Sequence, residues 1–440
     1  MLDRREFLGG VVGVAGVAAL PSAAGAAFAP SRGLIAEIRE RGAGLSPAAA
    51  ARDEDYWATV QQAFMVDRSM VNLNNGGVSP CSTFAHEALK RRLDEHNSMP
   101  TSNTLWAMQH PQIETVRERL AKGWGVDAEE IAITRNSSES LQICQMGIDL
   151  KAGDEILACT LDYPRMMTAF RQRERREGVK LVQIQIPVPC EDVAEVVRRY
   201  EAAITARTRM ILVSHVVNIT GQIMPVREIV EMARTKNGGI PVIVDGAHAL
   251  AQYDFKLSDL GCDYYGVSLH KWLQAPVGTG LLYVRREKIK GLWPLMAAAA
   301  EQSDNIRKFE EIGTHPEGIA LSIAEALTFH EAIGGARKEA RLRFLRDTWA
   351  ERIIASGKGR ARLHTSLNPR FSCAIGNLSI DGLDALTLQG WLWEKKRILV
   401  TTIGHEECKG NRITPSVYTT LDEVERFCEA VEWAMERGVE

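Results

Sequence analysis

Residues 242–248, with the sequence VIVDGAH, place an aspartate, Asp245, directly after a continuous apolar run. An apolar run this short, bounded by turn-forming residues, predicts a strand that is buried on both faces. Similar runs occur upstream at Glu155–Thr160, Lys180–Ile186 and Arg209–Val217. The segments between these runs have helical patterns, over residues 164–177, 191–205 and 225–236. Strands that alternate with helices predict an α/β fold with a parallel sheet covered on both faces.

The pattern changes from about Ile319 onward. Long charged helices, such as one expected over residues 331–346, are followed by strands at 374–380 and 397–402 and a helix at 422–436. We therefore expect a large domain over residues 71–318 and a smaller α+β domain over residues 319–440, after an N-terminal segment at 30–70. The 440 residues carry 53 basic and 56 acidic side chains, so no overall basic charge suggests a nucleic-acid partner.

Residues 1–29 predict an export signal. Arg4 and Arg5 are followed by Phe7-Leu8 and then by about twenty uncharged residues rich in Gly, Ala and Val, which is typical of a twin-arginine (Tat) signal peptide. The alternative is a membrane anchor, but so much Gly and Ala makes a poor spanning helix. We expect no stable membrane insertion, the Tat machinery as a partner, and a periplasmic mature protein.

The eight cysteines are scattered, and none forms a CxxC pair. This spacing supports neither a zinc site nor a thioredoxin-type motif, and the sequence predicts no metal.

A second motif, Ser268-Leu269-His270-Lys271-Trp272, follows Asp245 by about twenty-five residues and precedes the Gly-rich segment 278–283. Pyridoxal phosphate (PLP) chemistry requires a lysine that forms a Schiff base and a carboxylate that pairs with the pyridinium nitrogen. Taken alone, a strand-end aspartate is usually a helix cap, and a His-Lys pair is usually a surface feature. Their order along one predicted sheet favours a PLP site.

Together these motifs resemble the class V aminotransferase family of fold-type I PLP enzymes. The pairing of VDGAHA with SLHKW and PVGTGLLYVR is most similar to the isopenicillin N epimerase-like branch. The resemblance covers Val71 to the C-terminus. It implies PLP as cofactor, and a large domain with a mostly parallel seven-stranded sheet beside a smaller α+β C-terminal domain.

The resemblance also implies roles for individual residues. Lys271 matches the Schiff-base lysine and Asp245 the pyridinium partner, and these two are the predicted catalytic residues. His248 matches the residue at the ring hydroxyl, where desulfurases have Gln, and Ser268 and His270 match phosphate ligands. The remaining predicted cofactor and substrate residues are Ser137, Ser138, Tyr163, Asn218, Thr314, Arg412, Asn74 and Asn75.

Among these, Ser137 and Ser138 open a helix whose N-terminus would favour the phosphate, although such a turn is often only a cap. Tyr163 matches the aromatic that stacks on the ring, or is a plain Tyr-Pro turn residue, and Asn218 matches a residue near the ring hydroxyl and substrate. Thr314 matches a threonine that reaches the partner's phosphate, which implies a homodimer with shared active sites.

Arg412 matches the arginine that grips the substrate carboxylate in a bidentate fork. Asn74 and Asn75 lie where the N-terminal segment approaches that carboxylate. Further candidate substrate contacts are Trp106, Gln109 and the loop around Cys408.

We expect transamination of an amino acid or an amino-bearing peptide outside the cytoplasm. Export of such a fold is also similar to the periplasmic transaminases that tailor pyoverdine siderophores. The first alternative is a PLP epimerase or lyase of the isopenicillin N epimerase or cysteine desulfurase type. Cys408 lies only four residues before Arg412, too close for the mobile loop of a desulfurase. The second alternative is an exported binding protein that has lost catalysis.

Overall fold

The computed structural model describes residues 29–439. The predicted Tat signal therefore lies outside the described residues, apart from its last position. Across the described chain, no helix has both the length and the apolar character needed to cross a membrane.

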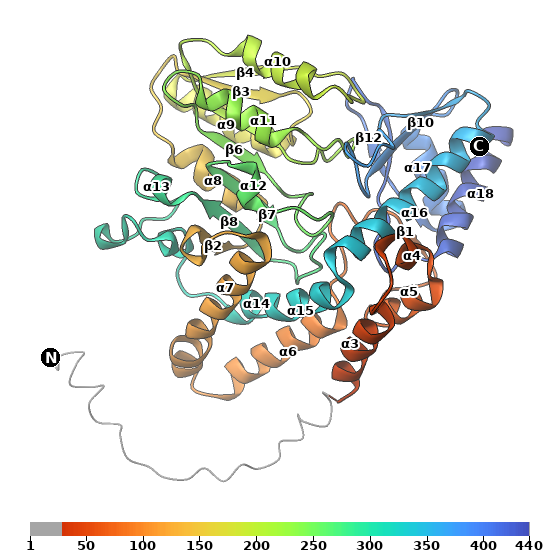
Figure 1. The fold of residues 1–440 in the computed structure, drawn as a ribbon, viewed down its shortest axis with the longest axis horizontal. Helices are drawn as coiled ribbons and strands as arrows, with labels where there is room; N and C mark the ends of the chain where they lie inside the picture. The colour runs from red at the N-terminus through yellow and green to blue at the C-terminus, as the bar shows by residue number, and fades with distance from the viewer. Residues whose placement is uncertain (1–28, 440) are drawn as a thin grey trace, which may run out of the picture.

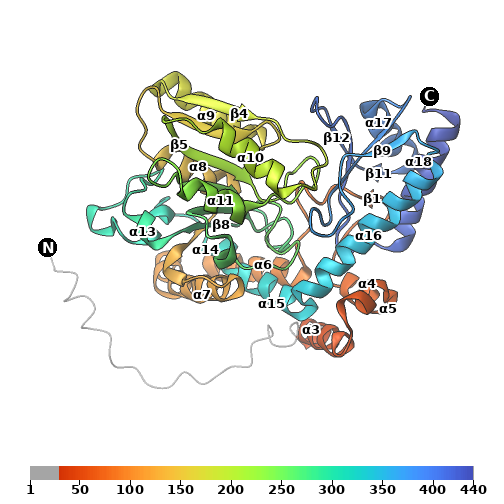
Figure 2. The same ribbon diagram turned by 45° about the horizontal axis from the view of Figure 1, so that its top comes forward.

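A seven-stranded mixed sheet forms the core of the larger part of the molecule, beside the C-terminal part (Figures 1 and 2). Only β8 runs antiparallel to its neighbours, so the predicted mostly parallel sheet is confirmed. In spatial order the strands are β2 (Ile131–Thr134), β8 (Gly280–Val284), β7 (Tyr264–Ser268), β6 (Val242–Asp245), β5 (Thr208–Ser214), β3 (Glu155–Cys159) and β4 (Lys180–Ile184).

Apart from the edge strand β4, which is partly exposed, both faces of this sheet are buried, which explains why the other strands are mostly apolar runs. Successive side chains of β5 alternate between two hydrophobic clusters, Ile211 and Val213 in one and Met210 and Leu212 in the other. The second cluster is covered by α8 (Ser137–Gly147), α9 (Pro164–Glu177) and α13 (Arg286–Ile289). The first is covered by α7 (Ile113–Trp124), α10 (Val193–Ala203), α11 (Val226–Arg234) and α12 (Leu257–Leu260).

The C-terminal part packs a third hydrophobic cluster around a four-stranded antiparallel sheet. Its strands, in spatial order, are β12 (Thr401–Ile403), β13 (Gly410–Ile413), β10 (Gly376–Ile380) and β9 (Ala361–Leu363), and its helices are α16 (Gly335–Ser356), α17 (Ala385–Lys396) and α18 (Leu421–Arg437). The short strand β1 (Val71–Asn72) pairs with β11 (Ile398–Leu399) and packs in this cluster. Val71, the expected start of the large domain, thus packs with the C-terminal part.

The other elements connect these two parts. In Figure 1 the long helix α16 runs from the large sheet to the C-terminal part, with α4 and α5 beside it. The connecting elements are α3 (Ala29–Gly42), α4 (Pro47–Arg52), α5 (Glu54–Gln61), α6 (Thr83–Ser98), η1 (Asn103–Gln109), η2 (His110–Gln112), η3 (Ala128–Glu130), η4 (Ala300–Gln302), η5 (Ile306–Glu310), α14 (Glu317–Leu321) and α15 (Ile323–Ile333).

Two expected elements are wrong in detail. The single helix expected over residues 331–346 is broken between α15 and α16, because Gly334 has a φ of 86°, which a right-handed helix does not contain. The single strand expected over 397–402 is divided into β11 and β12, which pair in different sheets.

Helix α16 also reaches the segment that follows β7. Lys338 is fully buried, and its ammonium group donates a hydrogen bond to the backbone carbonyl of Trp272. Burial lowers the pKa of Lys338 to about 7. The helix is thereby tied to the residue that follows Lys271.

This burial predicts a pH dependence of stability. Unfolded Lys338 has its ordinary pKa near 10.4, so between about pH 7 and that value the unfolded state binds more protons than the folded state. Below pH 7 the folded state bears the full cost of burying Lys338 as an ammonium ion. This cost decreases as the pH rises, because the buried amine is then uncharged in the folded state. The free energy of unfolding of the wild type should therefore rise relative to Lys338→Met, by roughly 1 kcal/mol per pH unit between pH 7.5 and 9. Denaturant titrations at several pH values measure this difference, and parallel curves would contradict it.

Candidate active site

Lys271, Asp245 and His248 meet at the carboxyl edge of the large sheet, just beyond β6 and β7. The Lys271 Nζ lies 3.0 Å from His248 Nε2. Burial lowers the pKa of Lys271 to about 8, helped by the charge of Arg412 and opposed by that of Asp245. A lysine with this pKa is uncharged much more often near neutral pH than an ordinary lysine, and its uncharged amine can act as nucleophile or base.

Asp245 is the last residue of β6 and is buried. Burial raises the pKa of its carboxyl group, while a hydrogen bond from the Ala247 N–H (3.0 Å) and the charge of Lys271 act in the opposite direction. A cationic ring nitrogen at this position would further stabilise the charged carboxylate.

The N-terminus of α8 forms a cradle beside these residues. Asn136 caps the helix by accepting a hydrogen bond from Glu139 N–H (2.9 Å). Ser268 Oγ accepts from Ser137 N–H (3.0 Å) and donates to Ser137 Oγ (2.8 Å), which fixes the helix against the end of β7. Ser138 follows within the first turn. The positive end of the helix dipole makes such a terminus suitable for a phosphate.

Gly280 explains how closely the neighbouring strand approaches this cradle. A Cβ atom on Gly280 would lie 2.6 Å from the backbone nitrogen of Asn136. The Gly-rich segment singled out in the sequence is therefore needed for a close packing contact.

Arg412, on β13 of the C-terminal part, is held at the junction with the large sheet. Its Nη1 donates to the backbone carbonyl of Asn218 (3.0 Å), and its Nη2 donates to Asn74 Oδ1 (2.9 Å). Burial lowers the pKa of Arg412 to about 10, an effect opposed by the phenol of Tyr163. Tyr163 is 42% exposed at the start of α9, so this side of the site is open.

Asn75 has a different environment from Asn74. Its Oδ1 accepts a hydrogen bond from Tyr418 OH (2.5 Å), and its Nδ2 donates to the Thr414 carbonyl (3.0 Å). These bonds hold the turn that presents Asn74 to Arg412.

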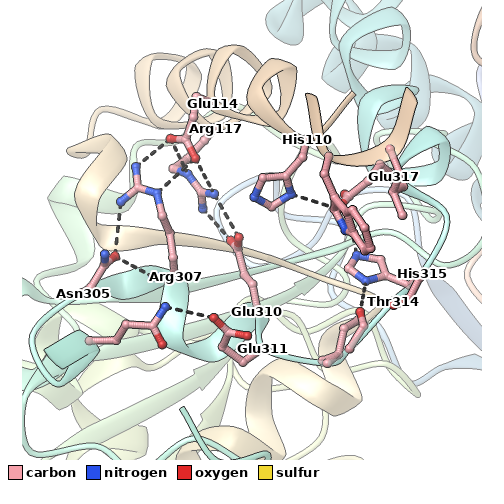
Figure 3. A pocket seen from close by; sticks show the side chains of 15 residues that line it. His110, Glu114, Arg117, Asn305, Arg307, Glu310, Glu311, Thr314, His315 and Glu317 are labelled. Atoms are coloured by element: carbon pink, nitrogen blue, oxygen red, sulfur yellow. Dashed lines mark hydrogen bonds and ion pairs between the residues drawn. The ribbon is translucent and has the colours of Figure 1, made fainter. Parts of the chain in front are cut away.

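Thr314 does not lie with the residues around Lys271. It lines a separate pocket of about 450 Å³, whose lining includes Trp106, His110 and Glu317 but none of the residues described above (Figure 3). Thr314 itself is exposed. Gln109, another candidate substrate contact, is buried and donates to the backbone carbonyl of Arg92 (3.1 Å).

The sequence analysis missed Asp162, a second buried carboxylate under the site. It accepts hydrogen bonds from Ser214 Oγ (2.7 Å) and Cys159 N–H (2.8 Å). Burial raises its pKa to about 6, and the nearby charge of Asp245 adds to the effect. The sequence could have indicated Asp162, because this residue closely follows strand β3 just as Asp245 ends strand β6.

The loop around Cys408 closes over the end of β3. Glu407 Oε1 accepts a hydrogen bond from Thr160 Oγ1 (2.6 Å), and His405 Nε2 lies 3.0 Å from the Thr160 carbonyl oxygen. Cys408 is fully buried, and burial raises the pKa of its thiol to about 12. This thiol is therefore a poor nucleophile.

The site has features that fit PLP. Within residues 29–439, three buried polar atoms of the predicted site have no hydrogen-bond partner: Asn218 Oδ1, His270 Nδ1 and Arg412 Nε. Buried polar groups are normally paired, so such atoms indicate a ligand with several polar groups. Lys271 would hold the aldehyde carbon of PLP, Asp245 its ring nitrogen, and the α8 cradle with Ser268 and His270 its phosphate.

Comparison with known proteins supports this assignment. The family model for class V aminotransferases matches residues 72–427. Isopenicillin N epimerase of Streptomyces clavuligerus is 30% identical over 86% of this chain and 98% of its own length. A probable cysteine desulfurase of Vibrio cholerae is 25% identical over 80% and 90% of the two chains.

Solved structures show the same fold. The cysteine desulfurase of Thermococcus onnurineus matches with a TM-score of 0.74 at 21% identity, over 87% of this chain and 98% of the other. The C-DES protein with glycine covalently linked to its PLP cofactor also gives a TM-score of 0.74 at 21% identity, over 84% and 98%. Since the family model spans most of the chain and the epimerase is covered almost end to end, this protein belongs to the class V aminotransferase family of PLP-dependent enzymes.

Proposed function

We propose that this enzyme is an epimerase that removes the α-proton of an amino acid, or of a peptide with free amino and carboxylate groups, and returns a proton to the opposite face. The observation that carries the proposal is the amine of Lys271, which lies 3.0 Å from His248 Nε2 and within the electrostatic fields of Asp245 and Arg412. The 30% identity to isopenicillin N epimerases supports the type of reaction.

When bound, PLP withdraws electrons from the α-carbon of an attached amino acid and makes its proton acidic. With a pKa of about 8, Lys271 is suited to accept that proton near neutral pH. Arg412 and Asn74 would orient the substrate carboxylate through charge-assisted hydrogen bonds, which fixes the α-carbon relative to Lys271. The presence of Lys271, Asp245 and Arg412 in one site also argues against the alternative of a binding protein without catalysis.

Two other reactions of the family are less well supported. A desulfurase needs a reactive thiolate, whereas Cys408 is buried with a raised thiol pKa. Transamination, the reaction expected from the sequence, would use the same residues but would deliver the proton to the cofactor instead of returning it to the α-carbon. The curated relatives compared above are an epimerase and a desulfurase, not transaminases.

The proposed enzyme is a homodimer with shared active sites. Thr314 is exposed and lies away from Lys271 of its own chain, a placement that suits a contact with the partner's phosphate group. We also propose that the substrate is met outside the cytoplasm, on the basis of the Arg4-Arg5 signal pattern.

Proton exchange distinguishes the reactions directly. In D₂O, the wild-type holoenzyme should introduce deuterium at the α-carbon of its substrates and invert their configuration, as measured by mass spectrometry and chiral chromatography of an amino-acid and dipeptide panel. Lys271→Ala should lower this exchange by about 10²–10⁴-fold, because the base is lost. The exposed Lys151→Ala is the matched control. Formation of keto acid without inversion would instead establish transamination.

The role of Arg412 predicts a selective loss of binding. Arg412→Lys keeps the positive charge but loses the planar fork, so KM should rise by roughly tenfold to a hundredfold for substrates with a free carboxylate. Substrates whose carboxylate is masked as a methyl amide should be affected much less. Equal losses for both substrate types would show that Arg412 does not contact the carboxylate.

Mixed dimers test the shared site. Thr314→Asp places a negative charge against the expected phosphate and should weaken PLP binding, while Lys271→Ala removes the base. After unfolding and refolding the two variants together, activity should recover to about a quarter of the wild-type value, since half of the dimers then hold one intact site. If the mixture stays inactive, Thr314 serves the site of its own chain, and if Thr314→Asp alone keeps full activity, Thr314 serves no site.

A further inference from the structure

Trp272 contacts the histidine that touches Lys271. Its Nε1 lies 3.4 Å from His248 Nδ1, with the two rings edge to face at 63° and their centroids 6.4 Å apart. An indole N–H can only donate a hydrogen bond. His248 Nδ1 must therefore be the acceptor and carry no proton.

The second ring nitrogen of His248 then has a defined role. His248 is buried, and burial together with the charges of Lys271 and Arg412 lowers its pKa well below the usual value, so the ring is neutral. A neutral imidazole carries one proton, which must be on Nε2 if it is absent from Nδ1. Nε2 lies 3.0 Å from Lys271 Nζ and donates its proton to that nitrogen. A nitrogen that accepts a hydrogen bond must offer a lone pair, so Lys271 is an uncharged amine in this arrangement.

We propose that Trp272 is a positioning residue that fixes the Nε2–H tautomer of His248 and thereby holds Lys271 as an uncharged amine ready to bond to an aldehyde carbon. The inference rests on the proposed function only in assigning Lys271 as the amine that binds PLP. It does not depend on which reaction the enzyme catalyses.

The surroundings of Trp272 favour such a fixed orientation. The side chain is 3% exposed within the main hydrophobic cluster, and its backbone carbonyl accepts a hydrogen bond from the buried Lys338 of α16. The indole is thus held at both its ring and its backbone, so its N–H has a defined direction.

Loss of the indole N–H would reverse the polarity of the contact between His248 and Lys271. The imidazole proton could then move to Nδ1, which makes Nε2 an acceptor that stabilises the Lys271 ammonium. The other groups facing Lys271 are Asp245, which favours the ammonium, Arg412, which disfavours it, and the adjoining His270. None of these requires a change when Trp272 is replaced. The pKa of Lys271 should therefore rise.

The experiment compares Trp272→Phe with Trp349→Phe. Trp349 is also fully buried, but in the part of the chain that the structure describes, its Nε1 has no hydrogen-bond partner and lies in the C-terminal cluster. The rate of PLP capture by cofactor-free protein is measured from pH 6 to 10, with borohydride trapping and peptide mass analysis at Lys271. Capture joins the amine nitrogen to the aldehyde carbon, and the two amine protons leave with the aldehyde oxygen as water.

Trp272→Phe should raise the apparent pKa of capture by about one unit and slow capture at pH 7 by about tenfold. Trp349→Phe should leave the profile unchanged. A wild-type profile for Trp272→Phe, or equal shifts in both variants, would overturn the proposal. Failure of the wild type to capture PLP at Lys271 would overturn the proposed function instead.

A second variant protects the test against a folding defect. Replacement of Trp272 by the isosteric benzothienyl amino acid exchanges only the N–H for a sulfur atom and keeps the volume of the ring. It should reproduce the shift of Trp272→Phe, and an unshifted profile in this variant would contradict the role of the N–H group.

Discussion

The structure depends on placing the amine of Lys271 and the carboxylate of Asp245 together in a poorly solvated site. Taking charged groups out of water costs several kcal/mol per ion unless partners compensate. The sheet supplies the compensation, because β6 and β7 are parallel neighbours and their carboxyl ends meet at one edge. Asp245 ends β6 and Lys271 follows β7, so each lies within the field of the other. Burial shifts both pKa values toward the uncharged forms, and their mutual attraction limits that shift.

The substrate end of the site depends on two distant parts of the chain. Arg412 comes from the C-terminal sheet, and Asn74 comes from the segment after β1. These parts meet because β1 pairs with β11 and Asn74 forms a bridge with Thr414. The proposed carboxylate-binding pair of Arg412 and Asn74 therefore forms only when the N-terminal segment has docked on the C-terminal part. A change in the angle between the two parts would move Arg412 relative to Lys271.

The sequence predicted elements whose causes are local and missed those set by distant partners. Helix α9 was predicted with its observed bounds, because Pro164 opens it and Gly178, with a φ of 72°, ends it. The division of β11 from β12 depends on which strand each segment pairs with. The break at Gly334 instead has a local cause, the positive φ of that glycine, which the prediction of a single helix overlooked. The clustering of Lys271, Asp245 and His248 was predicted from motifs, and the structure brings them together. The contact between Trp272 and His248 has no sequence signal, because it depends on the direction of one N–H bond.

The choice of reaction must depend on more than the overall fold, since relatives named as an epimerase and as a desulfurase both match most of this chain. In this chain the loop 404–409 is short and is fastened to the end of β3 by bonds from Thr160 to Glu407 and His405. The same fastening buries Cys408, so no reactive thiol reaches the substrate from this side. What remains near Arg412 is the half-exposed Tyr163 and open solvent. Under the proposed function, a substrate held there would lose its α-proton to Lys271, and this loop offers no acceptor for sulfur.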